Sequence, residues 1–240
     1  MTDTELEPLL CGHADAGSLS QITEQIPELR PMFGFRQHNP HHLHDVWTHT
    51  VLAVQNVPPE PVLRWAALLH DIGKPFCFTV EGDGIGHFYG HASVSASMAD
   101  QILTRLRMPQ AQKERIILLV KLHGSLPEPT ERAVGRFLRK HGMEVLRQLL
   151  TLSHADAVAT GFYREEEDLR PAILRCAELL EAEAQRFSVR DLAVNGHDLA
   201  ALGLQGAAIG QALGQLCAQV ENGQLANDRD ALLAFLKQQL

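Results

Sequence analysis

The chain has 240 residues, a hydrophobic content of 45% and a formal net charge of −8 at pH 7. This length and content allow one large packed domain, or one domain with an appendage, that folds without disulfide bonds. The four cysteines are scattered with no CxxC pair, which argues against a disulfide framework and a thiolate metal site, and the negative charge argues against a surface that binds nucleic acid over its whole extent.

The amino-terminal stretch "MTDTELEPLLCG" is acidic and lacks the positive region and the apolar region of a signal peptide. No run of about 18 apolar residues is present that could span a bilayer. We therefore expect a cytoplasmic protein that does not associate with a membrane.

Apolar residues recur at spacings of three and four through most of the chain, which is typical of amphipathic helices. The clearest stretches lie at 45–57, 61–71, 92–108, 111–123, 132–142 and 143–159. Between 76 and 89, aromatic and β-branched residues flank an Asp83-Gly84 turn signal, which predicts a small β-hairpin. We predict a mainly α fold, a helical bundle into which this hairpin is inserted.

The sequence changes character near residue 160. An acidic helical stretch at 164–187 is followed by "SVRDLAVNGHDLAALGL" and then by two more helical stretches. We therefore expect residues 1–160 to form one domain and residues 161–240 to form a helical tail that packs on it.

The stretch "AALLHDIGKPF", residues 66–76, places an imidazole and a carboxylate where an apolar helix ends. Neighbouring helix residues point about 100° apart, so His70 and Asp71 reach one point only if it lies at the helix end, and a divalent cation is the common target. Gly73 would let the chain turn away, and Lys74 would bring a positive charge beside the site without being a ligand. On the dipeptide alone, a hydrogen-bonded polar pair is the stronger interpretation.

Four further polar residues lie on or beside apolar stretches. They are His49, His91, His123 and Asp156. Each of them, taken singly, would be interpreted as a satisfied polar residue of the core. Together with His70 and Asp71 they provide four imidazoles and two carboxylates, which is enough to hold two cations with positions left for water and substrate.

The order His49, His70-Asp71, Asp156 resembles the H…HD…D signature of the HD superfamily of metal-dependent phosphohydrolases, and His91 and His123 match the additional histidines of its two-metal members. The stretches "FGFRQHNPHHLHDVWTHTVLAV", "LRWAALLHDIGKP", "GHFYGHASVSA", "ILTRLRMP" and "SVRDLAVNGHDLAALGL" are similar to the carboxy-terminal HD part of bacterial tRNA nucleotidyltransferases, the CCA-adding enzymes. Those enzymes carry an amino-terminal polymerase head with a Gly-Ser motif and paired carboxylates. The stretch "CGHADAGSLSQ" is too short to supply that head, so nucleotide addition is not expected.

The resemblance implies a phosphohydrolase that cleaves phosphomonoesters or phosphodiesters, such as the 2′,3′-cyclic phosphates of nucleotides or RNA ends, with two divalent ions as cofactors. It implies His49, His70, Asp71 and Asp156 as ligands of the first ion, and Asp71, His91 and His123 as ligands of the second. Asp71 would be shared between the ions, and Lys74 would steady the substrate phosphate. Ligation by nitrogen and oxygen alone suits Mn, Fe, Co, Ni or Mg.

Residues at the rim of the site would decide its specificity. His41 and His42, just before the first ligand, could face the substrate phosphate or base, although a solvated loop is the stronger interpretation. Arg132 and Arg136 belong to a band at 105–147 with ten basic and four acidic residues, which would attract an anionic substrate or an RNA end if it lined the cleft. The alternative is a solvated helix face.

Two other functions stay open. One is a non-catalytic module that binds tRNA or serves as a scaffold, since the resemblance extends through the tail. The other is hydrolysis of a nucleotide alarmone or a deoxynucleotide. Bound metal and phosphodiester hydrolysis that depend on Asp71 would favour an enzyme, whereas tRNA binding by metal-free protein would favour the module.

Overall fold

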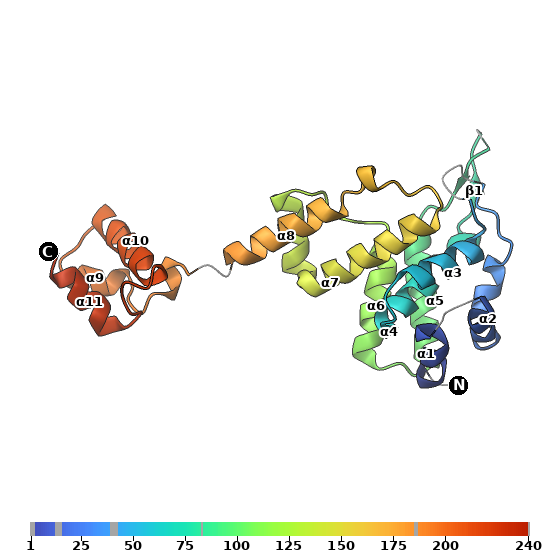
Figure 1. The fold of residues 1–240 in the computed structure, drawn as a ribbon, viewed down its shortest axis with the longest axis horizontal. Coiled ribbons are helices and arrows are strands. Elements are labelled where there is room, and N and C mark those ends of the chain that lie inside the picture. The colour runs from blue at the N-terminus through green and yellow to red at the C-terminus, as the bar shows by residue number, and fades with distance from the viewer. Residues whose placement is uncertain (1–2, 13–15, 39–42, 83, 185–186, 240) are drawn as a thin grey trace. The chain divides into compact units, whose positions relative to one another are not determined.

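The computed structural model describes residues 3–12, 16–38, 43–82, 84–184 and 187–239 of the chain (Figure 1). The chain divides into two compact units, unit 1 (Met1–Glu178) and unit 2 (Leu179–Leu240), and each has its own hydrophobic core. Within the described ranges, we find no helix with the length and apolar character needed to cross a bilayer.

Unit 1 is built mainly of helices. Its α-helices are α1 (Asp3–Cys11), α2 (Ala16–Gln25), α3 (Val46–Asn56), α4 (Pro61–Leu69), α5 (His91–Arg105), α6 (Gln110–Leu122), α7 (Glu131–Ala159) and the first part of α8 (Arg170–Ala184). Short 3-10 helices lie between them, namely η1 (Pro27–Met32), η2 (Lys74–Phe76) and η3 (Glu165–Glu167). The mainly α fold predicted from the sequence is confirmed.

Helix α4 lies at the centre of unit 1. Its sequence "PVLRWAALL" begins with a proline, which suits the first turn of a helix, and is apolar on nearly every side. The side chains from Leu63 to Leu69 are all buried, and α4 packs against α1, α3, α5, α6 and α7. The burial of α4 carries its carboxyl end, where His70 and Asp71 follow, into the interior of the unit.

Two helices that are distant in the sequence, α3 and α7, pack side by side in unit 1 (Figure 1). Asp45 caps α3 and Thr130 caps α7, each by accepting a hydrogen bond from a backbone N–H three residues on. Helix α7 is interrupted at Gly142, where φ is +82°, in agreement with the separate stretches predicted at 132–142 and 143–159. The pairing brings the middle of α3 next to the last turns of α7.

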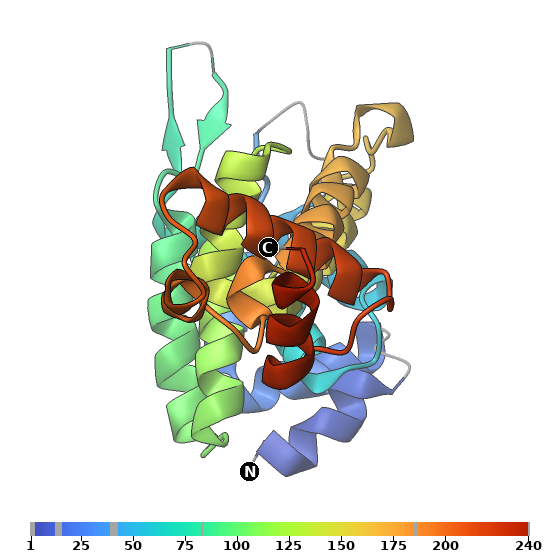
Figure 2. The same cartoon turned by 90° about the vertical axis from the view of Figure 1, so that its left-hand side faces the viewer.

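A small β-hairpin precedes α5, as the sequence predicts. Strand β1 (Thr79–Val80) pairs antiparallel with β2 (Gly86–His87), with the first residue of each strand opposite the last residue of the other. Gly84 has φ of +78° in the connecting turn, whereas Asp83, its partner in the turn signal, lies outside the described residues. The hairpin extends from the end of unit 1 at which α5 begins (Figure 2).

Unit 2 is also helical. It contains η4 (Val189–Asp191), α9 (Gly196–Ala201), α10 (Ala207–Glu221) and α11 (Arg229–Lys237). Its buried apolar side chains are Leu192, Val194, Leu199, Ala212, Leu216, Leu232 and Leu236. These helices bury one another's apolar faces, so unit 2 has an interior that does not depend on the core of unit 1.

The division between the units lies at Glu178, inside α8, and not near residue 160. The first part of α8 belongs to unit 1 because Ile173 and Ala177 are buried there and because the Arg170 guanidinium donates a hydrogen bond to the Ser153 carbonyl oxygen at 2.5 Å. The expected packing of the tail on the first domain stays a prediction.

Gly73 lies where the chain leaves α4 and passes α5. Its φ of −81° and ψ of −16° are open to any residue, so the turn itself does not need a glycine, contrary to our expectation from the sequence. A Cβ at this position would lie 2.8 Å from the carbonyl oxygen of His91 and 2.8 Å from the backbone nitrogen of Ser95. Glycine is therefore required here because the backbone of α5 approaches so closely.

We expect the substitution Gly73→Ala to lower the free energy of unfolding by about 1–3 kcal/mol, the usual cost of forcing an added methyl group into a packed interior. Urea unfolding monitored by circular dichroism measures this change. Gly82→Ala is the matched control, because a Cβ at Gly82 meets no described atom within 4 Å. A Gly73→Ala protein as stable as the wild type would show that α5 moves aside without cost.

Candidate metal centre

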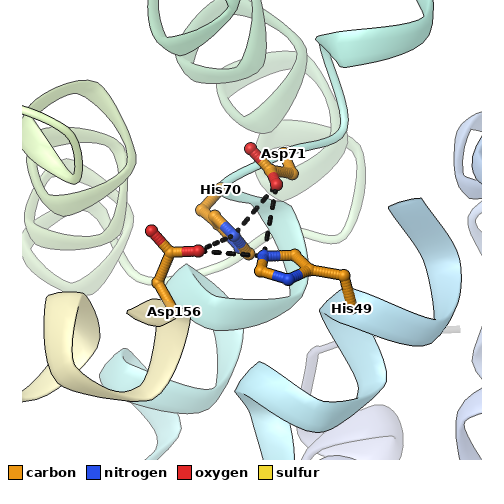
Figure 3. A group of neighbouring side chains, drawn as sticks. All are labelled: His49, His70, Asp71 and Asp156. Carbon is orange, nitrogen blue, oxygen red and sulfur yellow. Dashed lines mark hydrogen bonds and ion pairs between the residues drawn. The ribbon is translucent and has the colours of Figure 1, made fainter. Parts of the chain in front are cut away.

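Four of the predicted side chains converge where α3, α4 and α7 meet (Figure 3). His49 comes from the middle of α3, His70 and Asp71 follow the last turn of α4, and Asp156 lies near the end of α7. The Nε2 atom of His49 lies 2.9 Å from Asp156 Oδ1 and 3.5 Å from Asp71 Oδ2. The Nε2 atom of His70 lies 3.2 Å from Asp71 Oδ2 and 3.4 Å from Asp156 Oδ1. We call these four residues the first ligand group.

Asp71 also belongs to a second ligand group, which it forms with His91 and His123. The Asp71 Oδ1 atom lies 3.4 Å from His91 Nε2 and 3.8 Å from His123 Nε2, and the two imidazole nitrogens are 3.1 Å apart. His91 opens α5, and His123 ends α6. One carboxylate therefore directs Oδ2 to the first ligand group and Oδ1 to the second.

Three of the imidazoles are oriented by the same local contact. The Nδ1 atoms of His70, His91 and His123 lie 2.7, 2.8 and 2.6 Å from the carbonyl oxygen of the residue three positions earlier. In a neutral imidazole, an Nδ1–H that donates to this carbonyl leaves the lone pair on Nε2, which is directed toward the carboxylates. The backbone thus selects the tautomer in which each Nε2 can bind a cation.

The electrostatic environment couples these groups. Burial acts to lower the pKa of His70, but the carboxylates of Asp71 and Asp156 outweigh it and raise this pKa to about 10. Burial acts to raise the pKa of Asp71, but the positive charge of His70 holds it well below its usual range. Asp156 has a similarly lowered pKa, because the hydrogen bond from His49 and the positive charge of His70 outweigh its burial. Burial and the charge of His70 lower the pKa of His123 to about 4.

The donor set fits divalent cations. The buried Nε2 atom of His70 and both carboxylate oxygens of Asp71 have no hydrogen-bond partner among the described residues, although ion-pair contacts surround them. Buried polar atoms normally have a hydrogen-bond partner or bind a metal. Imidazole nitrogens with carboxylate oxygens suit first-row transition ions and Mg²⁺. The two groups could thus hold one cation each, with Asp71 shared.

Lys74 lies beside the cluster. Its buried ammonium is 2.7 Å from Asp71 Oδ2, donates to Gln37 Oε1 at 2.8 Å and lies 5.4 Å from the centre of the Phe88 ring. The Gln37 amide in turn donates to the backbone carbonyl of His44 at 3.2 Å. The positive charge is therefore held next to Asp71 by a side chain that comes from another part of the chain.

A pocket of about 510 Å³ opens onto both ligand groups. It is lined by Asp71, Lys74, Gly86, His87, Phe88, Tyr89, His91, His123, Gly124, Asp156, Ala157 and Thr160. His49, His70 and Asp71 are buried, whereas the side chains of Asp156 and His91 are 28% and 24% exposed. A ligand would therefore approach the cluster from the side of Asp156 and His91.

The four residues predicted at the rim of the site are not among the described residues that line the 510 Å³ pocket. His41 and His42 lie outside the described residues. Arg132 and Arg136 are exposed on the first part of α7 and are not among the described residues that line the 510 Å³ pocket. Four other basic residues of the 105–147 band are paired with acidic side chains. These pairs are Arg105–Glu28, Lys113–Asp100, Arg115–Glu144 and Arg147–Glu178.

Sequence reasoning did not assign several residues of the pocket wall. The hairpin places His87, Phe88 and Tyr89 in this wall, and none of the three is predicted from the sequence as a site residue. Gln37, which accepts a hydrogen bond from Lys74, is likewise not predicted from the sequence as a site residue. The sequence feature that could indicate this pocket wall is the aromatic stretch "HFYGH", which ends at the predicted ligand His91.

The clustered residues lie in a part of the chain that matches a known protein family. The HD domain model matches residues 36–161, which include all six clustered residues. The chain is 35% identical to the A-adding tRNA nucleotidyltransferase of Deinococcus radiodurans over 89% of its own length and 51% of that relative. It is 35% identical to the CC-adding tRNA nucleotidyltransferase of Thermus thermophilus, with 88% and 48% covered. The chain thus spans about half the length of these relatives.

Cation binding at the first ligand group is expected to release protons. Because the pKa of His70 is raised to about 10, its imidazole carries a proton at pH 7.5 that a cation must displace. We expect the affinity for Mn²⁺ to rise with pH between 6 and 9, with release of about one proton when the first ligand group fills at pH 7.5. Calorimetric titration in buffers of different ionisation enthalpy measures this number.

The variant His154→Gln is a suitable control, because His154 is an exposed imidazole on α7 that does not line the 510 Å³ pocket in the described structure. It should release the same number of protons as the wild type. A heat of Mn²⁺ binding that does not depend on the buffer would contradict the displacement of a proton from His70.

Proposed function

The chain belongs to the HD-domain family, and on this basis we propose that it is a divalent-metal-dependent phosphohydrolase acting on nucleotides or on phosphates at RNA ends. The observation that carries the proposal is the position of Asp71. Its two carboxylate oxygens face separate ligand groups at the base of an open pocket. This is the arrangement expected of a carboxylate that bridges two cations.

The proposed roles follow from the two groups. His49, His70, Asp71 and Asp156 would hold one ion, and Asp71, His91 and His123 would hold the other. Divalent ions bound there would supply a nucleophile at neutral pH and positive charge for the phosphoryl oxygens.

The protein itself would orient the ligand atoms and place a positive charge beside the substrate phosphate. The backbone carbonyls fix three imidazole tautomers, so the ligand atoms do not have to reorient when the site fills. Lys74 lines the pocket and would donate to a phosphate oxygen while its ion pair holds Asp71 in place. Because Lys74 is buried, this charge acts in a region of low dielectric, where it interacts more strongly than at the surface.

The substrate class is proposed from the relatives and from the pocket together. The relatives in Deinococcus radiodurans and Thermus thermophilus are named for A or CC addition to tRNA, and this chain matches about half of each. A pocket of about 510 Å³ has the size of a site for a small ligand or the end of a chain. We therefore propose a nucleotide phosphate or the terminal phosphate of an RNA, with 2′,3′-cyclic phosphates as the first candidates.

A non-catalytic tRNA-binding module is the second candidate. It is favoured by the extent of similarity, which covers 89% of the chain and so continues beyond the HD domain at 36–161. In that case the cluster would be a structural metal site or a buried polar network. Fluorescence anisotropy with labelled tRNA, measured on protein with and without bound metal, distinguishes this module from the enzyme.

The substitution Asp71→Asn tests the hydrolase. The amide keeps the shape of the side chain but removes the charge and one acceptor oxygen, so both ligand groups lose their shared member. We expect metal content to fall and hydrolysis of bis-p-nitrophenyl phosphate and 2′,3′-cyclic AMP to drop by about 100-fold or more. Elemental analysis and rates over a panel of phosphodiesters, phosphomonoesters, deoxynucleotides and an alarmone provide the measurement.

Asp100→Asn is the matched control for this experiment. Asp100 is an exposed carboxylate on α5 that pairs with Lys113 at 2.9 Å, and its loss should leave metal content and rates unchanged. Metal-loaded wild-type protein that hydrolyses no member of the panel, or an Asp71→Asn variant with full activity, would rule out the proposed reaction.

A further inference from the structure

The hairpin presents an aromatic pair at the pocket. The rings of His87 and Tyr89 are stacked, with centroids 5.2 Å apart and an angle of 4° between their planes. Tyr89 is 68% exposed, which is unusual for a large aromatic side chain that lines a pocket. A nearly parallel pair of rings with one member exposed offers a flat π surface to a ligand.

One carboxylate lies next to both rings of this pair. The Tyr89 hydroxyl donates to Glu81 Oε1 at 3.0 Å, and Glu81 Oε2 lies 3.8 Å from His87 Nε2. Glu81 directly follows β1, and His87 ends β2, so the contact spans the hairpin. The pairing of the two strands positions His87, and the hydrogen bond to Glu81 orients the Tyr89 ring that is stacked on it.

The stacked rings lie in the same pocket as the ligand groups. His87 and Tyr89 line it together with Asp71, His91 and His123. Tyr89 is only two residues from His91, so the flat surface and the second ligand group are joined by a short piece of backbone. A molecule with a phosphate at the ligand groups and a planar ring beside that phosphate would contact both.

We propose that Tyr89, stacked on His87 and held by Glu81, is a subsite for the nucleobase next to the phosphate. This proposal rests on the proposed function, because it places the phosphate at the ligand groups. Stacking on an aromatic side chain tolerates any base, since every base has a π face, and is the usual way in which proteins bind unpaired bases. The base can belong to a free nucleotide or to the terminal residue of an RNA.

A second exposed aromatic residue lies nearby and provides the control. Phe162 is 49% exposed and lines a neighbouring pocket that shares Ala157 and Thr160 with the 510 Å³ pocket. Among the described residues, no other ring is stacked on Phe162 and no carboxylate orients its ring. We therefore assign the base to Tyr89 and not to Phe162.

The experiment compares two ligands that differ only in the base. Adenosine 5′-monophosphate and ribose 5-phosphate are titrated calorimetrically into the full chain, with Mn²⁺ and after chelation. The ratio of the two dissociation constants measures the contribution of the base. We expect AMP to bind about 5- to 100-fold more tightly than ribose 5-phosphate, as base stacking predicts.

Variants then assign this contribution to a residue. Tyr89→Leu should bring the ratio close to 1 with little change in the affinity for ribose 5-phosphate, and Tyr89→Phe should keep most of the ratio because the ring remains. Phe162→Leu should leave the ratio unchanged. A general disturbance of the pocket would weaken both ligands equally, so an unchanged ratio in Tyr89→Leu overturns the proposal, as does loss of the ratio in Phe162→Leu.

A short RNA with a 3′-phosphate, with and without its terminal base, distinguishes the two sources of the base. If the base tightens binding through Tyr89 only in the RNA pair, the subsite is assigned to RNA ends. If the base does so only for AMP against ribose 5-phosphate, the subsite is assigned to free nucleotides. Ratios near 1 for both pairs in the wild type overturn the proposal. Because binding after chelation is measured without turnover, a Tyr89-dependent ratio in a protein that hydrolyses nothing separates this inference from the proposed function.

Discussion

The buried carboxylate of Asp71 is the group around which unit 1 is arranged. Its side chain is 1% exposed, and a charge removed from water to this degree is costly unless opposite charges and hydrogen-bond donors surround it. The compensation comes from separate parts of the chain, namely the imidazole of His70 after α4, the ammonium of Lys74 and the imidazole of His49 on α3. Displacement of any of these helices would leave part of the charge unbalanced, so the packing of the core and the geometry of the cluster depend on each other.

The cluster is assembled mostly at helix ends, and this has a simple physical origin. His70 and His123 each follow the last residue of a helix, where the carbonyl three residues earlier has no intrahelical partner and accepts from Nδ1. The same contact that satisfies the end of the helix therefore aims Nε2 at the carboxylates. A bundle that gathers several buried helix ends at one point can build a cation site with few additional constraints.

The convergence of the six clustered residues is predicted because polar side chains on apolar helices must find partners in the interior, but their division into two ligand groups is implied only by the resemblance to the HD superfamily. The part of the pocket wall formed by the hairpin cannot be predicted from the sequence. The role of His87 depends on its alignment with Tyr89, which is a property of the tertiary structure. A count of charges along α7 likewise does not reveal that Arg132 and Arg136 are not among the described residues that line the pocket. The sequence predicts that Gly73 serves a turn, whereas glycine is required there by the approach of α5, which the local sequence does not contain.

The interruption of α7 at Gly142 has a mechanical consequence. An unbroken helix of 29 residues would be a rod of about 43 Å that transmits force along its axis. The glycine divides this rod into an outer segment, which carries Arg132 and Arg136, and an inner segment, which carries Asp156. Because the helix is kinked at this glycine, the segment that carries Asp156 has an axis of its own, and its direction is not set by that of the outer segment.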